Sequence, residues 1–256
     1  MYFCTQINAN AMNPTNHHRS IRRFRAELPE QKLLDEILQA GTRASNTGNM
    51  QAYSVVVTTN AELLDKLCAC HYRQPAAGAP VQLTFCADFN RFSRWCLQRN
   101  AQPGFGNFLS FLVAYGDAML AAQNVCLAAE EKGLGICYLG TVLYNADKII
   151  DILSLPKGVV PAATVALGYP DEQPPLTDRL PLQAVVHRET YRDYSPEDID
   201  RLYAEKEALP LHRELPAVNK KETLAQIFTD IRYPKAANDA ASEKLLEVLK
   251  RQGFLG

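Results

Sequence analysis

The chain has 256 residues, of which 47% are hydrophobic and 21% charged, and its formal net charge is −1. This composition is typical of a globular protein with a sizeable core, and it lacks the basic excess expected of a nucleic-acid-binding protein. No apolar run is long enough for a transmembrane helix, and residues 1–16 lack the basic start and apolar core of a secretory signal. We therefore expect a cytoplasmic protein without membrane or nucleic-acid partners.

The seven cysteines are an odd number, and none has the paired spacing of a zinc site. Cys68 and Cys70, with His71 beside them, come nearest to one, but a metal ion would need further ligands elsewhere. Most of the others adjoin apolar residues, where a reduced cysteine acts as a small hydrophobic side chain. In a reducing compartment we expect free thiols, with neither a disulfide nor a metal site.

The first half of the chain alternates helical and strand patterns. Leu33, Leu34, Ile37 and Leu38 form an apolar stripe that ends at Gly41, which is typical of an amphipathic helix. Runs rich in β-branched residues indicate strands. In chain order we expect a helix over residues 30–41, a strand over 53–58, a helix over 61–69, an apolar central strand over 81–87, and irregular structure over 90–108.

The second half contains the longest predicted helix, over residues 109–132. Many alanines make this helix narrow enough for another helix to approach closely, and Gly133 is its expected C-terminal cap. Strands are expected over 136–139 and 162–168, followed by a proline-rich segment over 171–181. The remaining residues predict two or three polar-faced helices that pack against the body or against a second subunit.

One stretch concentrates positive charge in a chain whose net charge is near zero. Residues 18–25 contain four arginines and a histidine around two apolar residues, Ile21 and Phe24. Such a cluster, anchored by apolar side chains, indicates a partly buried site for an anion. The alternative interpretation is a solvated basic face on a short helix.

No motif for side-chain nucleophiles or metal hydrolysis is present, since the sequence has neither Gly-x-Ser-x-Gly nor His-Glu-x-x-His. Gly133, Gly135 and Gly140 do not fit the dinucleotide fingerprint, because they follow a helix instead of opening one. A reaction carried by a bound cofactor is therefore favoured over one carried by side chains.

Four motifs occur along the chain in a particular order. They are His18-Arg19-Ser20-Ile21-Arg22-x-Phe24, Ser45-Asn46-Thr47-Gly48-Asn49-Met50-Gln51 before a strand, Gly133-Leu134-Gly135 with Tyr138-Leu139-Gly140, and a proline-rich segment ending in Arg179-Leu180-Pro181. In residues, order and spacing they resemble the FMN-dependent nitroreductase family. The resemblance covers residues 18–191 and is greatest to the NADPH-type oxygen-insensitive nitroreductases and flavin reductases, whose long C-terminal arm suits this tail.

The resemblance implies an α+β fold with a central mixed β-sheet flanked by helices. It also implies an intertwined homodimer with FMN at the subunit interface, in which the helix over 109–132 forms the core of the dimer contact. Residues 1–16 would then be an N-terminal extension, 17–194 the FMN-binding core, and 195–256 a C-terminal helical arm on the core or the partner subunit.

The resemblance assigns cofactor contacts but no catalytic side chain, because the chemistry takes place on FMN. His18, Arg19 and Ser20 would hold the FMN phosphate and ribityl chain. Arg22 would face the ring near N1 and O2, where a cation favours reduction. The other implied contacts are Ser45, Asn46, Thr47, Asn49 and Gln51 around the ring and ribityl chain, Gln74 near the ring, Tyr138, Leu139 and Gly140 near flavin N5 or O4, and Arg179 at the phosphate.

The implied activity is ping-pong transfer of hydride from NADH or NADPH, through FMN, to an electron-poor nitroaromatic, quinone or flavin. Thr177 departs from the family pattern because it replaces a phosphate-binding lysine, and Leu215 or a neighbour replaces an arginine that binds NADPH. Lys220 and Lys221 either substitute for that arginine or are two exposed lysines. The alternative functions are a flavin carrier or sensor without turnover, and a dehalogenase-like reductase of the same superfamily.

Overall fold

The computed structural model describes residues 14–255, which fall into two compact units. The first, here called the core unit, contains the residues up to Pro175 together with those from Glu243 onward. The second, here called the helical unit, is Leu176–Ser242. Most of the predicted N-terminal extension, with Cys4, lies outside the described residues.

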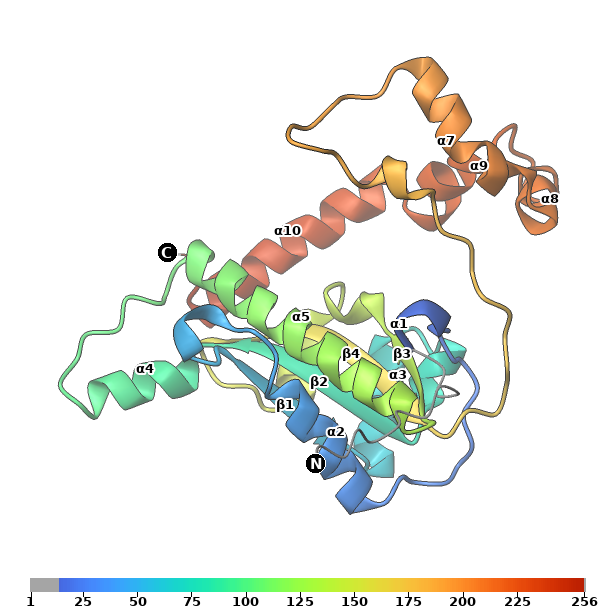
Figure 1. Cartoon of the computed structure of the whole chain (residues 1–256). Coiled ribbons are helices and arrows are strands. Elements are labelled where there is room, and N and C mark those ends of the chain that lie inside the picture. Colours follow the sequence, from blue (N-terminus) through green and yellow to red (C-terminus); the bar gives the residue numbers. More distant parts are fainter. Residues whose placement is uncertain (1–13, 256) are drawn as a thin grey trace, which may run out of the picture. The chain divides into compact units, whose positions relative to one another are not determined.

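A four-stranded antiparallel sheet forms the centre of the core unit (Figure 1). In spatial order its strands are β1 (Tyr53–Thr58), β2 (Val81–Asp88), β4 (Val159–Gly168) and β3 (Gly135–Tyr138). Every residue of the two central strands is buried, as expected from the apolar run over 81–87. The predicted α+β fold is confirmed, but the one parallel pairing among the described residues is a bridge between Ser20 and Ile136, so the four strands themselves are not a mixed sheet.

Helices α2 (Gln31–Gly41) and α5 (Phe108–Glu131) cover one face of this sheet. The Asn107 side chain caps α5 by accepting a hydrogen bond from a backbone N–H of its first turn. Gly41 lies so close to α5 that a Cβ there would be 2.5 Å from Cγ2 of Val125. By length and apolar composition α5 could cross a membrane. One side of it packs in the core of the unit, whereas Leu109, Leu112 and Leu120 are exposed.

Helix α3 (Ala61–Cys70) and a 3-10 turn, Pro75–Gly78, lie on the opposite face. Cys137 and Ala166 of the sheet point toward this turn, while their neighbours along the strands point toward α5. Helix α6 (Ala146–Ile152) packs against α3. The predicted helices and strands of this unit are therefore present, with boundaries within a few residues of those expected.

The prediction of irregular structure over residues 90–108 was wrong for its first part, because Asn90–Leu97 forms helix α4. The carboxylate of Asp88, at the end of β2, accepts hydrogen bonds from two backbone N–H groups in the first turn of α4. This contact satisfies donors that a helix start leaves free, and it stabilises a helix of only eight residues.

The two ends of the described chain pack on α5. Helix α1 (Pro14–His17) contacts it near one end, and Phe254 packs against Phe111 near the other, with ring centroids 5.7 Å apart. Phe254 follows helix α10 (Lys235–Gln252), whose last residues belong to the core unit. Phe254 is only 1% exposed, so the C-terminus is firmly anchored in this unit.

The helical unit contains the helices predicted for this part of the chain. Its elements are α7 (Pro196–Ala208), α8 (Pro210–Val218), α9 (Leu224–Gln226), the π-helical turn Ile227–Arg232 and the first part of α10. Ser195 caps α7 and Thr223 caps α9, each in a reciprocal capping box with the third helical residue. These caps determine the first residue of each helix, which hydrophobic periodicity alone does not specify.

A Gly135→Ala substitution tests how tightly the basic segment is held against β3. A Cβ at position 135 would lie 2.7 Å from Cγ1 of Ile21, so Ile21 must shift to accommodate it. We expect the free energy of unfolding, measured in urea, to fall by about 1–3 kcal/mol. Gly140→Ala is the matched control, since nothing lies within 4 Å of a Cβ there. Equal losses in the two variants would contradict the close packing of Ile21.

Candidate functional site

Residues 18–25 run as an extended strap along the end of the sheet where β3 begins and β4 ends. Ile21 is buried, and its backbone N–H donates to the carbonyl oxygen of Ile136 at 2.9 Å. Further along, the backbone N–H of Arg25 donates to the carbonyl oxygen of Tyr169 at 2.9 Å. The segment is not helical, so the interpretation as a basic helix face is wrong, and its apolar residues anchor it as expected.

Two of the basic side chains in this strap are paired with carboxylates. His18 Nδ1 lies 2.7 Å from Oε1 of Glu130, near the end of α5. Arg23 Nε donates to Oε2 of Glu172 at 3.2 Å, while Oε1 of Glu172 accepts from the backbone N–H groups of Arg22 and Arg23. These hydrogen bonds hold the pKa of Glu172 below its ordinary value, and the one from the Arg22 N–H has the largest effect. Arg23, which had no predicted role, is thus a partner for Glu172.

The other three arginines of the strap keep their charge available. Arg19 donates from Nη1 to the carbonyl oxygen of His17, but its buried Nε has no hydrogen-bond partner among residues 14–255. The exposed guanidinium of Arg22 likewise has no partner within the described chain. Ser20, between them, is half-buried. Arg25, at the end of the strap, is also exposed and its guanidinium has no partner among residues 14–255. The strap therefore offers three free cations and a hydroxyl to an anion.

The amide-rich loop of residues 45–51 is built on a buried carboxylate, that of Asp117 in α5. Its Oδ1 accepts from the backbone N–H and the hydroxyl of Thr47, at 2.9 and 3.1 Å, and its Oδ2 accepts from the Ala52 N–H at 3.2 Å. Asp117 is 2% exposed, and a carboxylate so deeply buried requires several donors. The Ser45 side chain, at the start of the loop, is exposed.

The rest of this loop has three residues with left-handed backbone conformation, and hydrogen bonds from side chains hold its shape. Gly48, Asn49 and Gln51 have φ values of 56°, 54° and 51°, and only the glycine adopts this region without strain. The side-chain Oδ1 of Asn46 accepts from the Gln51 N–H at 3.1 Å, and Arg91 donates to the backbone carbonyl oxygen of Gln51. The Asn49 side chain is exposed, so its amide is available to a ligand.

Gln74 lies beside the segment that follows β3, because its Nε2 donates to Oγ1 of Thr141 at 3.1 Å. In this segment the Tyr138 side chain packs in the main core, where burial raises the pKa of its hydroxyl, and Leu139 is 1% exposed. Gly140 is exposed, with nothing within 4 Å of the position of a Cβ. A ligand on this side would therefore meet the Gly140 backbone and the Gln74 amide more readily than the Tyr138 or Leu139 side chains.

The strap and the amide-rich loop lie at different ends of the core unit. The strap is tied to Glu130 and the loop to Asp117, which are thirteen residues apart on α5. At 1.5 Å per residue, this corresponds to about 20 Å along the helix. One copy of the chain therefore does not bring Arg22 and this loop to the same small ring, although both were predicted to contact it.

Arg179 belongs to the helical unit, where its Nη1 donates to the Thr177 hydroxyl at 2.6 Å and to the Asp178 carbonyl oxygen at 2.9 Å. The Asp178 carboxylate is paired with Lys206 at 2.6 Å, which lowers the pKa of Asp178. The threonine that replaces the family's lysine thus supports Arg179. Arg179 remains exposed, so its guanidinium keeps donors for a ligand.

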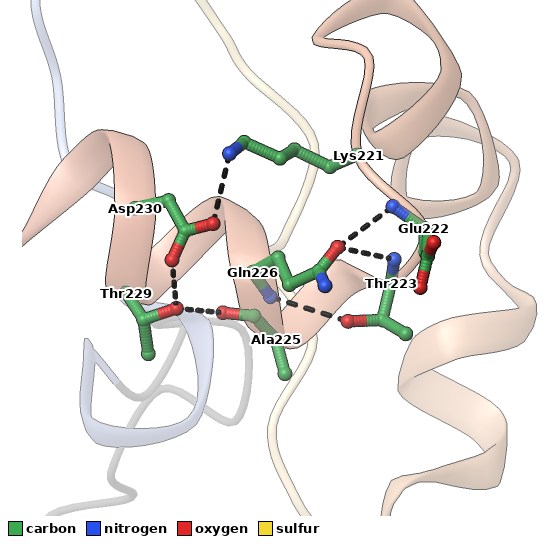
Figure 2. A network of polar contacts seen from close by, with 7 residues as sticks. All are labelled: Lys221, Glu222, Thr223, Ala225, Gln226, Thr229 and Asp230. Atoms are coloured by element: carbon green, nitrogen blue, oxygen red, sulfur yellow. Dashed lines mark hydrogen bonds and ion pairs between the residues drawn. The ribbon is translucent and has the colours of Figure 1, made fainter.

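Figure 2 shows that Lys221, one candidate substitute for the missing NADPH arginine, is paired with Asp230 at 2.8 Å. The same network contains the capping box of Thr223 and Gln226. Lys220 is exposed and has no partner among residues 14–255, whereas Leu215 is half-buried in α8. Of the two lysines, Lys220 is therefore the one with a free charge.

Sequence reasoning missed Asp117 and considered His71 as the neighbour of a possible metal site, although both are buried polar residues bonded to segments of the candidate site. Asp117 was detectable as an acidic residue within the alanine-rich apolar stretch of α5. His71 is 0% exposed, and its Nδ1 lies 2.8 Å from Oγ1 of Thr141, a partner that no local pattern indicates. Burial lowers the pKa of His71 from 6.5 to about 4, so the imidazole is neutral at physiological pH.

The described cysteines are all free, and burial raises the pKa values of Cys86 and Cys126 to about 12, so they hold little thiolate at neutral pH. No cluster of metal-ligating side chains occurs among residues 14–255. In the helical unit, His187 contacts the Tyr194 hydroxyl at 3.2 Å and His212 the Lys206 carbonyl oxygen at 2.7 Å. None of these groups adds to the candidate site.

The fold and the site together define an α+β protein that offers free arginines, a hydroxyl and side-chain amides to a phosphate-bearing cofactor. Residues 16–169 match the family model described as the Nitroreductase family. The chain belongs to this family, and the predicted resemblance is confirmed.

Known relatives extend the similarity beyond the matched region. An FMN reductase (NADPH) of Bacillus subtilis is 34% identical over 71% of this chain and 74% of its own length. An FMN reductase [NAD(P)H] of the same organism is 33% identical over 93% of this chain and 94% of its own length. A crystal structure from Bacteroides fragilis, named for an oxidoreductase, has a TM-score of 0.94 and 51% identity, covering 96% of this chain and all of that one.

The buried His71 predicts a pH dependence of stability. The unfolded chain binds a proton at this residue below about pH 6.5 and the folded chain only below about pH 4. Stability should therefore fall as the pH drops from 6.5 to 4, by up to about 3 kcal/mol from this residue. Urea unfolding of the wild type and of His71→Asn across this range isolates the effect, since other groups cancel in the difference. Parallel curves for the two proteins would contradict a neutral buried imidazole.

Proposed function

We propose that this chain is an FMN-dependent NAD(P)H oxidoreductase that reduces electron-poor aromatic, quinone or flavin acceptors. The observation that carries the proposal is the free charge of Arg19 and Arg22 on a strap whose His18 and Arg23 are paired with Glu130 and Glu172. The names of the relatives, which include FMN reductases and an oxygen-insensitive NADPH nitroreductase of Salmonella typhimurium, support this activity.

The residues present fit FMN. The buried, partnerless Nε of Arg19 is a donor that a phosphate oxygen would satisfy, and His18 and Ser20 stand on either side of it in sequence. Arg22 would place a positive charge at the pyrimidine edge of the ring, and Arg179 would complete the phosphate site. When bound, FMN supplies the hydride-accepting chemistry, while the protein orients the donor and excludes water.

The remaining contacts would come from the amide-rich loop, the Gln74 amide and the backbone at Gly140. In this proposal the side chains of Ser45, Asn46, Thr47, Asn49 and Gln51 line the ring and ribityl chain, and the Tyr138–Gly140 backbone reaches N5 or O4. The structure supports a backbone contact at Gly140, because its position is open. No side chain is required to act as an acid or base.

A second copy of the chain would complete the site. The strap that carries Arg22 is tied to Glu130 through His18, and the amide-rich loop is tied to Asp117, so a ring that touches both requires a loop from another protomer. We therefore propose an intertwined homodimer with FMN at the interface. Residues 17–194 would be its FMN-binding core and 195–256 its helical arm, on the core or the partner. We propose that the enzyme acts in the cytoplasm.

A flavin carrier or sensor is the second candidate function. It is favoured by the absence of one phosphate lysine, at Thr177, and by the pairing of Lys221 with Asp230, which leaves fewer charges for NADPH. Such a protein would bind FMN but would not pass hydride to it.

The visible absorption spectrum of the purified protein, taken without oxygen, separates these functions. Flavin bands that bleach on adding NADH or NADPH support the oxidoreductase, and the relative rates identify the donor. Bands that persist with both donors support the carrier. A colourless protein that takes up no added FMN contradicts both.

Arg22→Ala should slow reduction of the flavin more than it weakens FMN binding. The substitution removes a cation at the ring and leaves the phosphate contacts in place. A charge-assisted contact of about 1.5–3 kcal/mol corresponds to at least a tenfold slower reduction. Stopped-flow mixing with the preferred donor measures this rate, and Arg23→Ala is the matched control because its charge is already paired. Equal rates for wild type and Arg22→Ala would remove Arg22 from the ring.

A mixing experiment tests whether two chains share each site. Arg22→Ala damages the strap and Asn46→Ala the amide-rich loop, so each homodimer should be slow. In a heterodimer of the two, one site would contain both defects and the other neither. Co-expression under two affinity tags should therefore recover one intact site per heterodimer. Activity no higher than that of the two homodimers would show that both segments serve one site within a chain.

A further inference from the structure

The turn after helix α3 is strained at two adjacent residues. Tyr72 and Arg73 have φ values of 54° and 50°, a left-handed backbone conformation that residues other than glycine rarely adopt. Two such residues in succession persist only when the surroundings hold them, and strained turns of this kind are common at ligand sites. The next residue is Gln74, whose amide lies beside the exposed backbone after β3.

Three buried or half-buried hydrogen bonds join this turn to the segment that follows β3. Asn145 donates from Nδ2 to the Cys70 carbonyl oxygen at 2.7 Å. His71 Nδ1 lies 2.8 Å from Oγ1 of Thr141, and Gln74 Nε2 donates to the same oxygen at 3.1 Å. The Thr141 hydroxyl is therefore shared by two side chains that flank the strained pair. Moving Thr141 would move the Gln74 amide with it.

A histidine at this buried position costs folding free energy that an apolar side chain would not. It is fully buried, its Nε2 has no hydrogen-bond partner in the described part of the chain, and its ring makes one side-chain hydrogen bond, that to Thr141. A leucine could fill comparable space without burying an unpaired polar atom. The contact with Thr141 is thus the feature that distinguishes histidine here from an apolar side chain.

We infer that His71 is a positioning residue for the flavin. Through Thr141 it sets the place of the Gly140 backbone on one side and of the Gln74 amide on the other, so the environment of the bound ring depends on a histidine that never touches it. This inference rests on the proposed function, in which FMN lies against Gly140 and Gln74. It concerns residues of the core unit alone.

Two pairs of substitutions test it. Thr141→Val removes the shared hydroxyl and Thr141→Ser keeps it, while His71→Leu removes the Nδ1 contact and His71→Asn can restore it with its side-chain amide. We expect Thr141→Val and His71→Leu to weaken FMN binding by about tenfold, the effect of one buried hydrogen bond and its unpaired partner. Both should also change the visible spectrum and the midpoint potential of the flavin that remains bound. Thr141→Ser and His71→Asn should stay close to wild type in all three measurements.

The melting temperature of each FMN-free variant separates positioning from simple stabilisation. If His71 only stabilises the fold, His71→Leu and Thr141→Val change the melting temperature but leave the spectrum and potential of bound FMN as in wild type, which would overturn the inference. Lys66→Gln, on the exposed side of α3, is the matched control. It should leave the spectrum and the midpoint potential of bound FMN as in wild type. A wild-type protein that binds no FMN would instead overturn the proposed function itself.

Discussion

Both halves of the candidate site are fixed to one helix, α5, whose packing on the sheet sets their places. Asp117 reaches the amide-rich loop from one part of this helix, and Glu130 reaches His18 from another. Because an α-helix rises by a constant amount per residue, the spacing of these two carboxylates fixes the distance between the segments they hold. The chain thus separates residues that the proposed FMN site would bring together, which is why we propose that a second copy completes it.

Carboxylates decide which basic residues of this chain remain available. Glu172 pairs with Arg23 and binds the backbone around it, and Asp230 pairs with Lys221, so neither cation is left for an anionic ligand. Arg19 and Arg22 carry no such partner in the described residues. A count of positive charges in the sequence therefore overstates the binding charge, because the neighbouring carboxylates already pair some of these cations.

Local pattern predicted most of the fold. The apolar stripe of α2, the β-branched run of β1 and the alanine-rich stretch of α5 each have a periodicity that depends only on neighbouring residues, and each element is where it was expected. Helix α4 was missed because its start depends on a carboxylate, Asp88, that belongs to the preceding strand. In a helix of only eight residues, such a contact is a large part of what specifies the start.

By itself, the sequence determined the local elements, the basic strap and the family, since all three follow from residue types and their spacing along the chain. Only the tertiary structure decided which partner each polar side chain takes. Thr47 binds a carboxylate seventy positions away, and His71 shares a hydroxyl with Gln74 across a similar separation. Such pairs form because buried polar groups must find partners once the helices pack against the sheet, and no local pattern records which groups that packing will bring together.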